Sequence, residues 1–188
     1  MIAIRRARPA DAAAIAAVHV AAWRSAYPGI LPDEYLARLS VARHAAQYES
    51  AIRGGVGVHV AAASGLDIQG GLPTGLGPRI VGFASADRAR MPGIGEGEIE
   101  TLYVLDDWRE RGLGRRLIRA AAAHLASSGC SSAYLWVLRD NPSRWFYQRL
   151  GGRPVAETTI RVGGVPVVQI AFAWDPIGRL LQASPQAS

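Results

Sequence analysis

Apolar and polar residues alternate along several short segments of the chain, a period of two that is typical of half-buried β-strands. The first such segment runs from Ile2 to Arg8. Later apolar-rich runs are bounded by glycine, proline or polar residues, which favours strands. We predict further strands at residues 56–63, 80–86, 98–105, 133–138, 155–162 and 165–173.

Elsewhere the apolar residues recur every three or four positions, which predicts amphipathic helices. The clearest case is Leu113, Leu117, Ala121 and Leu125, after which Gly129 ends the helix. We predict three further helical stretches: one opened by Pro9-Ala10-Asp11 and ended by Pro28-Gly29, one from Pro32 to about Ile52 that is broken near Ser40, and one from Asn141-Pro142 to Gly151-Gly152.

The order of these elements predicts the fold. Strand 98–105, the helix after it and strand 133–138 make a βαβ unit, so these two strands should be parallel. Gly163-Gly164 predicts a two-residue hairpin between the last two strands. The glycine- and proline-rich stretch 64–78 is interpreted as a loop inside another hairpin. We therefore predict an α/β fold with a mixed, mostly antiparallel sheet and helices on both faces, formed by one domain over residues 1–175, with residues 176–188 as a frayed tail.

Composition narrows the classes of protein. The chain has 188 residues, nearly half of them hydrophobic, which suits one folded domain. Its only cysteine, Cys130, rules out an internal disulfide and a multi-cysteine zinc site. No run approaches the ~18 apolar residues of a membrane span, and the first residues do not resemble a signal peptide. We expect a cytoplasmic protein without a metal and without a membrane partner.

Charge points to an anionic ligand. The net charge is +6, and all 21 basic residues are arginines. Five of these arginines fall within eleven residues, beside a pair of glycines, which favours a compact site for a small polyanion over an extended nucleic-acid surface. They are Arg109, Arg111, Arg115, Arg116 and Arg119.

The arginines lie around a turn between the predicted strand 98–105 and the next helix. Gly112 and Gly114 allow several backbone N–H groups to converge there, and the start of the helix adds its own free N–H groups. Such a turn could bind a pyrophosphate, although an ordinary strand-to-helix turn with solvated arginines explains the same spacing. It is neither a three-glycine dinucleotide loop nor a lysine-bearing phosphate loop.

Two motifs resemble those of the GNAT N-acetyltransferase superfamily. Arg109-x-x-Gly112-x-Gly114 is similar to the family's R/Q-x-x-G-x-G/A pattern, and the segment 141–152 (NPSRWFYQRLGG) is similar to its N-x-x-x-x-FYxxLG signature. Both occur in the family's order around strand 133–138, and the resemblance extends over about residues 2–174. It implies a sheet of about seven strands whose central parallel pair splays apart to admit coenzyme A.

The resemblance also implies which residues hold acetyl-CoA. The backbone of Leu102, Tyr103 and Val104 would bind the pantetheine arm as an added strand does. Asn141 would contact the pantetheine or cap its helix. The pyrophosphate would lie on the loop made by Arg109, Glu110, Arg111, Gly112, Leu113, Gly114 and Arg115.

Acetyl transfer to an amine needs a base for the ammonium proton and an acid for the departing thiolate. Tyr147 occupies the family's FY position, which implies contact with coenzyme A and the role of general acid. Glu98 and Glu100 are candidates for the base, and strict alternation would put both on one face with Leu102 and Val104. His19, on an apolar helical stripe, is interpreted as a core or cleft-lining residue.

Three functions follow from these observations. We favour an N-acetyltransferase that moves the acetyl group directly from acetyl-CoA to a primary amine of a small molecule or a peptide N-terminus. One alternative is an acyl-CoA-binding module without catalysis. The other is a nucleic-acid-binding protein, suggested by the charge and opposed by the absence of basic tails. The resemblance also allows a homodimer.

Overall fold

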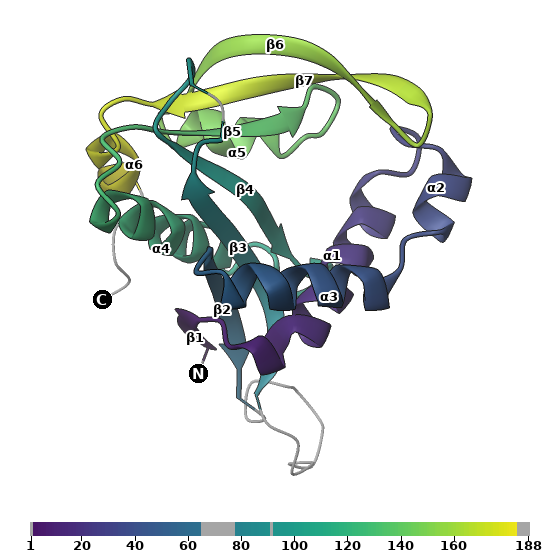
Figure 1. The fold of residues 1–188 in the computed structure, drawn as a ribbon. Helices are drawn as coiled ribbons and strands as arrows, with labels where there is room; N and C mark the ends of the chain where they lie inside the picture. The colour runs from purple at the N-terminus through teal and green to yellow at the C-terminus, as the bar shows by residue number, and fades with distance from the viewer. Residues whose placement is uncertain (1, 65–77, 91, 184–188) are drawn as a thin grey trace.

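The computed structural model describes residues 2–64, 78–90 and 92–183 and contains one seven-stranded sheet (Figure 1). Neighbouring strands follow the order β1-β2-β3-β4-β5-β7-β6. All neighbours pair antiparallel except β4 and β5, which confirms the predicted mixed sheet. The strands are β1 (Ile2–Arg6), β2 (Gly57–Ala63), β3 (Arg79–Arg88), β4 (Gly97–Val104), β5 (Ala133–Leu138), β6 (Arg153–Val162) and β7 (Val165–Trp174).

Helices cover both faces of the sheet, as predicted. On one face α4 (Leu113–Ser127) buries its apolar stripe against β2, β3 and β4, with Leu117 and Leu125 fully buried. On the other face α1 (Ala12–Ala26) packs against α3 (Val41–Arg53) and the sheet through Ile15 and Val18. Within the described residues, no helix is long and apolar enough to cross a membrane. The remaining helical segments are η1 (Pro9–Asp11), α2 (Asp33–Ala37), η3 (Asp106–Trp108), α5 (Arg144–Arg149) and α6 (Gly178–Ala183).

The parallel strands β4 and β5 diverge soon after they meet. They pair only at Gly97 with Ala133 and at Glu98 with Tyr134. Beyond these positions β4 stays paired with β3, and β5 follows β7 along its whole length. The sheet therefore opens at its centre, next to the start of α4 (Figure 1).

A β-bulge in β4 corrects one sequence-based expectation. Ser85 of β3 lies opposite Thr101, whereas its neighbour Ala86 lies opposite Ile99, so Glu100 is the extra residue of the bulge. A bulge shifts the alternation by one residue. Glu98 and Glu100 therefore do not share a face with Leu102 and Val104, which pack on the α4 side. Thr101 and Tyr103 instead face the α1 and α3 side, where Tyr103 packs against that core.

The final hairpin forms as predicted. Gly163 and Gly164 connect β6 and β7 with φ angles of 59° and 84°, the positive values that a two-residue hairpin turn of type I′ requires. The ring of Tyr35, just inside α2, packs so closely beneath Gly163 that a Cβ there would lie 2.7 Å from it. This contact joins the hairpin turn to the α1–α2 region.

One predicted boundary is confirmed and another is wrong. The helical stretch 32–52 is indeed broken at Ser40, whose hydroxyl caps α3 by accepting the N–H of Arg43. Residues 176–188, however, were predicted as a tail, and part of them forms α6 with Leu180 fully buried against the α4 side of the core. The predicted loop 64–78 falls almost wholly on residues 65–77, which lie outside the described part.

Because Leu180 is fully buried, we expect Leu180→Ala to lower the free energy of unfolding by about 2–5 kcal/mol. Urea denaturation followed by circular dichroism measures this change. Gln182→Ala, at an exposed position of the same helix, is the control and should change stability by less than about 0.5 kcal/mol. Equal, small effects of both substitutions would mean that α6 does not belong to the cooperative fold.

Candidate functional site

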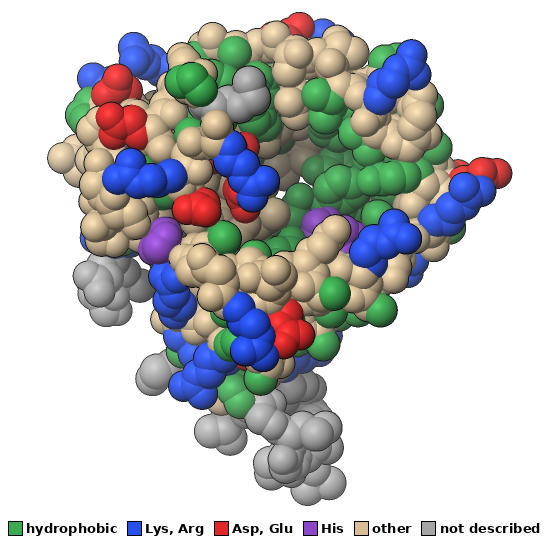
Figure 2. All heavy atoms as spheres, in the orientation of Figure 1, with side chains coloured by type: hydrophobic (Ala, Val, Ile, Leu, Met, Phe, Trp, Pro, Cys, Tyr) green, Lys and Arg blue, Asp and Glu red, His purple; other side chains and the backbone are tan. Residues whose placement is uncertain are grey.

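A cavity of about 620 Å³ occupies the opening between β4 and β5. Its walls come from the end of α1, from β4 and β5, from the loop before α4, from α5 and from the β6–β7 hairpin. Figure 2 shows a hollow on this face, with hydrophobic side chains gathered toward α1 and α2 and acidic side chains on the other side. Residues far apart in sequence thus meet in one concave site.

The loop before α4 presents unpaired backbone donors. Glu110 and Gly112 have positive φ angles of 60° and 73°, which turn successive N–H groups toward one side. In the described part of the chain, the N–H groups of residues 110–115 have no intramolecular hydrogen-bond acceptor. The positive end of the α4 dipole points to the same place. An anion that binds here would satisfy donors that the protein leaves open.

The arginines of this loop differ in their surroundings. Arg109 pairs with Asp106 at 2.9 Å and its Nε lies 3.4 Å from the carbonyl oxygen of Val104, while its side chain stays half exposed. Arg115 also lines the cavity. Arg111, which the sequence placed among the coenzyme ligands, does not line it, because its guanidinium lies over the buried ring of Trp108, 4.8 Å from the ring centre.

We expect Gly112→Val to weaken coenzyme A binding at least about tenfold, because a branched side chain disfavours the positive φ that aims the N–H groups. A Cβ at Gly112 meets no atom within 4 Å, so the fold itself should survive. Gly151→Val is the matched control: its φ is 78°, its Cβ is equally free, and it does not line the cavity. Isothermal calorimetry of both variants gives the comparison, and an equal loss of affinity in both would refute the assignment.

Gly114 lies where the start of α4 meets α5. A Cβ there would lie 3.4 Å from the ring of Phe146, an ordinary contact distance, so the start of α4 lies directly against α5. The two sequence motifs, one on each helix, are therefore packed against each other at the cavity.

The open edge of β4 carries further backbone donors and acceptors. Leu105 donates its N–H to Val81 of β3, and successive residues of a strand alternate in direction. The N–H and carbonyl groups of Leu102 and Val104 therefore point away from β3, toward the cavity. The backbone of Tyr103 points toward β3, so only Leu102 and Val104 can accept an added strand.

Tyr147 lies on α5 and lines the cavity while being only 8% exposed. Burial raises the pKa of its phenol, with a further contribution from Tyr27, so it stays protonated at any physiological pH. Asn141 holds the start of this segment: its side-chain oxygen accepts the N–H of Ser143 at 2.9 Å, and its amide donates to the hydroxyl of Tyr27 at 3.3 Å. Asn141 thereby ties the α5 segment to α1.

Of the two candidate glutamates, only Glu100 lines the cavity. Its side chain is 33% exposed, and partial burial raises its pKa, with repulsion from Glu98 and Asp87 in the same direction and Arg90 opposing them. Glu98 instead accepts a hydrogen bond from the hydroxyl of Tyr134 at 3.0 Å. A carboxylate that holds its proton more tightly than usual suits a base.

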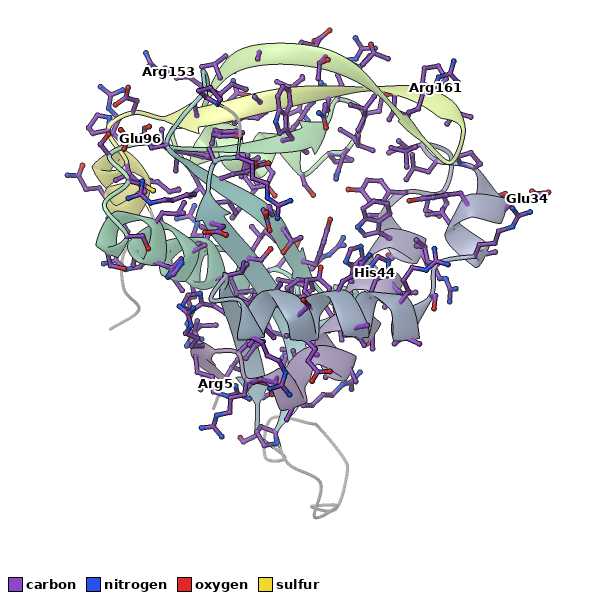
Figure 3. The ribbon with its side chains drawn as sticks, viewed as in Figure 1. Arg5, Glu34, His44, Glu96, Arg153 and Arg161 are labelled. Carbon is purple, nitrogen blue, oxygen red and sulfur yellow. The ribbon has the colours of Figure 1, made fainter. Side chains whose placement is uncertain are left out.

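His19 belongs to the packing between α1 and α3. Its Nδ1 lies 2.7 Å from the hydroxyl of Tyr48, and its ring stacks on His44, labelled in Figure 3, with 4.2 Å between the ring centres. Burial and the neighbouring His44 lower the pKa of His19 to about 4. The imidazole is therefore neutral at neutral pH, and it does not line the cavity.

Comparison with known proteins decides the family. The profile described as "Acetyltransferase (GNAT) family" matches residues 72–152. The uncharacterized N-acetyltransferase YuaI of Bacillus subtilis is 33% identical over 181 residues, which cover 96% of each chain. The chain belongs to the GNAT acetyltransferase family. It is therefore an acyl-CoA-dependent N-acetyltransferase.

Solved GNAT structures share its fold. A GCN5-related N-acetyltransferase from Rhodopseudomonas palustris is 25% identical and superposes with a TM-score of 0.65, covering 92% of this chain and 94% of that one. The acetyltransferase YncA from Salmonella typhimurium, solved with its cofactor acetyl-CoA, is 20% identical and has a TM-score of 0.66, covering 100% and 97%.

The GNAT cavity brings together most of the residues that the sequence singled out. The exceptions are Glu98 and three arginines of the cluster: Arg111, Arg116, which bonds the carbonyl of Ile2, and Arg119, which bonds the carbonyl of Leu181. The cavity also contains residues that the sequence did not indicate, chiefly Trp23 and Tyr27 of the α1 end, Thr101 of the bulge, and Val162 and Gln169 of the hairpin. These residues lie on elements whose sequence pattern predicts a helix or a strand but indicates no binding or catalytic role. Among the described residues, no three His, Cys, Asp or Glu side chains gather as metal ligands.

Proposed function

We propose that this GNAT enzyme transfers an acetyl group from acetyl-CoA directly to a primary amine of a small molecule or a peptide N-terminus. The observation that carries the proposal is the meeting, in one cavity, of unpaired backbone donors, an open strand edge and two proton-transfer groups. YncA from Salmonella, which has the same fold, was solved with acetyl-CoA, and this supports the choice of donor.

The residues fit the coenzyme on two counts. The free N–H groups of residues 110–115, with Arg109 and Arg115, match the charge of a pyrophosphate. The outward backbone groups of Leu102 and Val104 match the amides of a pantetheine arm, which would add to β4 as a short strand. We therefore place the thioester at the end of this edge, beside Tyr147.

Glu100 would receive the proton of the bound ammonium, directly or through one water, and leave a neutral amine that can attack the thioester carbon. As the C–N bond forms, the N–H of Val104 would stabilise the oxyanion. Tyr147 would donate its proton to sulfur as the C–S bond breaks. The second proton that the nitrogen loses would return to the phenolate of Tyr147, so the products are an amide and free coenzyme A, with one proton released. No acyl-enzyme is needed because the site holds both reactants together.

The test is a panel of amines, amino acids and N-terminal peptides incubated with acetyl-CoA, followed by thiol release and by mass spectrometry of the product. We expect an acetylated amine, and initial rates that intersect in a double-reciprocal plot, as direct transfer requires. Parallel lines would contradict direct transfer. Binding of acetyl-CoA without turnover of any amine would favour the non-catalytic binding module instead.

A further inference from the structure

The cavity has two parts, one on each face of the sheet. The loop before α4, where we place the pyrophosphate, leads into α4 on one face of the sheet. Helix α1 and Thr101, which follows the bulge residue Glu100, lie on the other face. Glu100 lines the cavity next to Thr101, and its charge acts on Tyr48 of α3. If the coenzyme occupies the loop and the β4 edge, the acceptor amine must approach from the α1 face. This inference therefore rests on the proposed function.

The cavity wall on that face is aromatic and aliphatic. Trp23 and Tyr27 meet edge to face, with ring centres 5.0 Å apart, and Leu31 is buried beside them. Strands β5 and β6 complete this surface from the opposite side. We call the α1-side wall the set Trp23, Tyr27, Leu31, Leu138, Ile160 and Val162.

Among the described residues that line this face of the cavity, Glu100 is the one charged side chain. Its carboxylate lies 3.9 Å from the guanidinium of Arg90, an 81% exposed side chain that does not line the cavity. The cavity's arginines are Arg109, Arg115 and Arg149, which come from the loop before α4, from α4 itself and from α5. Within the described lining, the α1-side wall holds no charged side chain, and Glu100 is the one acid beside it. Two charged residues near its outer end, Glu34 on α2 and Arg161 on β6, point outward (Figure 3), and Arg161 bonds the carbonyl of Gly164.

We propose that the acceptor is a monoamine with an apolar, preferably aromatic, body and no carboxylate, of the phenylalkylamine class. Its ammonium has one partner in Glu100 and the faces of Trp23 and Tyr27 nearby. An amino acid would bring a carboxylate for which the described residues of the α1-side wall offer no cation, and a buried unpaired charge is costly. A polyamine would bring a second ammonium, and a peptide would bring backbone amides. The described residues of the α1-side wall offer no carboxylate to the one and mostly apolar side chains to the other.

Matched acceptors test the proposal in the wild-type enzyme at saturating acetyl-CoA. Phenethylamine and phenylalanine differ only by the carboxylate, and we expect kcat/KM to be about 100-fold higher for phenethylamine. Propylamine, spermidine and a peptide with an N-terminal alanine complete the set, each expected below phenethylamine. A preference for phenylalanine, spermidine or the peptide overturns the acceptor class and leaves the proposed function standing. If coenzyme A binds but no amine is acetylated, the proposed function falls and this inference falls with it.

A charge placed on the wall gives an independent test. Val162→Arg supplies the missing cation, so the preference for phenethylamine over phenylalanine should narrow at least about tenfold. Val155→Arg, on the same strand but 50% exposed and outside the cavity, is the control and should leave the ratio unchanged. The ratio of kcat/KM values does not depend on the amount of active enzyme. An unchanged ratio in Val162→Arg would overturn the assignment of the α1-side wall to the acceptor.

Discussion

Replacing Tyr147 by phenylalanine is expected to lower kcat about 100-fold without loss of the fold or of coenzyme affinity. The phenol lines the cavity, and burial raises its pKa, so it carries a proton throughout the assay range. Among the described residues its hydroxyl has no hydrogen-bond partner, so the substitution breaks no internal bond. The loss should appear equally in kcat and kcat/KM, because the proton is needed only in the transition state.

Steady-state kinetics with a second acyl donor make this test sharper. When the thiol of the acyl donor is more acidic, its thiolate leaves without being protonated. The loss of kcat in Tyr147→Phe should therefore be smaller with such a donor. Tyr134→Phe is the control: Tyr134 is also buried but does not line the cavity, and it bonds Glu98 instead. An unchanged kcat in Tyr147→Phe, where chemistry limits the rate, would leave water as the proton source.

Replacing Glu100 by glutamine should lower kcat about 100-fold or more, because the ammonium then has no base. In the wild-type enzyme kcat should fall as the pH falls through the raised pKa of Glu100, since only the carboxylate accepts a proton. Glu100→Gln should lose this acidic limb. The measurement is the pH dependence of kcat with the preferred amine.

Glu98→Gln is a matched control for which we expect a different pH dependence of kcat. Its negative charge is one cause of the raised pKa of Glu100, although it does not line the cavity. Glu98→Gln should therefore keep the plateau of kcat within about threefold and move the acidic limb to lower pH. A larger loss in Glu98→Gln than in Glu100→Gln would reverse the assignment of the base.

The residues that we propose for the coenzyme could be predicted from the sequence because they lie in contiguous segments. The loop 109–115 and the segment 141–152 each place their chemistry by local spacing, and the pairing of β4 with β5 followed from the βαβ order. The bulge at Glu100 was not predicted, because the polar pair Glu100-Thr101 in EIETLYVL does not by itself indicate an extra residue, which appears only in the pairing with β3. The two glutamates were therefore assigned to the face of Leu102 and Val104 in error.

The part of the cavity that we propose for the acceptor depends on contacts between distant elements. Tyr27 meets the α5 segment through Asn141, and Tyr35 meets the hairpin turn at Gly163. No short-range pattern marks such contacts, since apolar residues at helical or strand spacing look the same whether they line a core or a cavity. The helix α6 was missed for a similar reason, because its burial against the α4 side depends on the whole sheet.

The central claim is that the cavity between β4 and β5 holds the coenzyme, and calorimetric titration with acetyl-CoA tests it most directly. We expect one site per chain, and a melting temperature that rises with the logarithm of the ligand concentration, with about 2.7 kcal/mol of added stability at 100 times Kd. Gly112→Val should weaken this binding and Gly151→Val should not. No heat of binding and no thermal shift at millimolar acetyl-CoA would contradict the account.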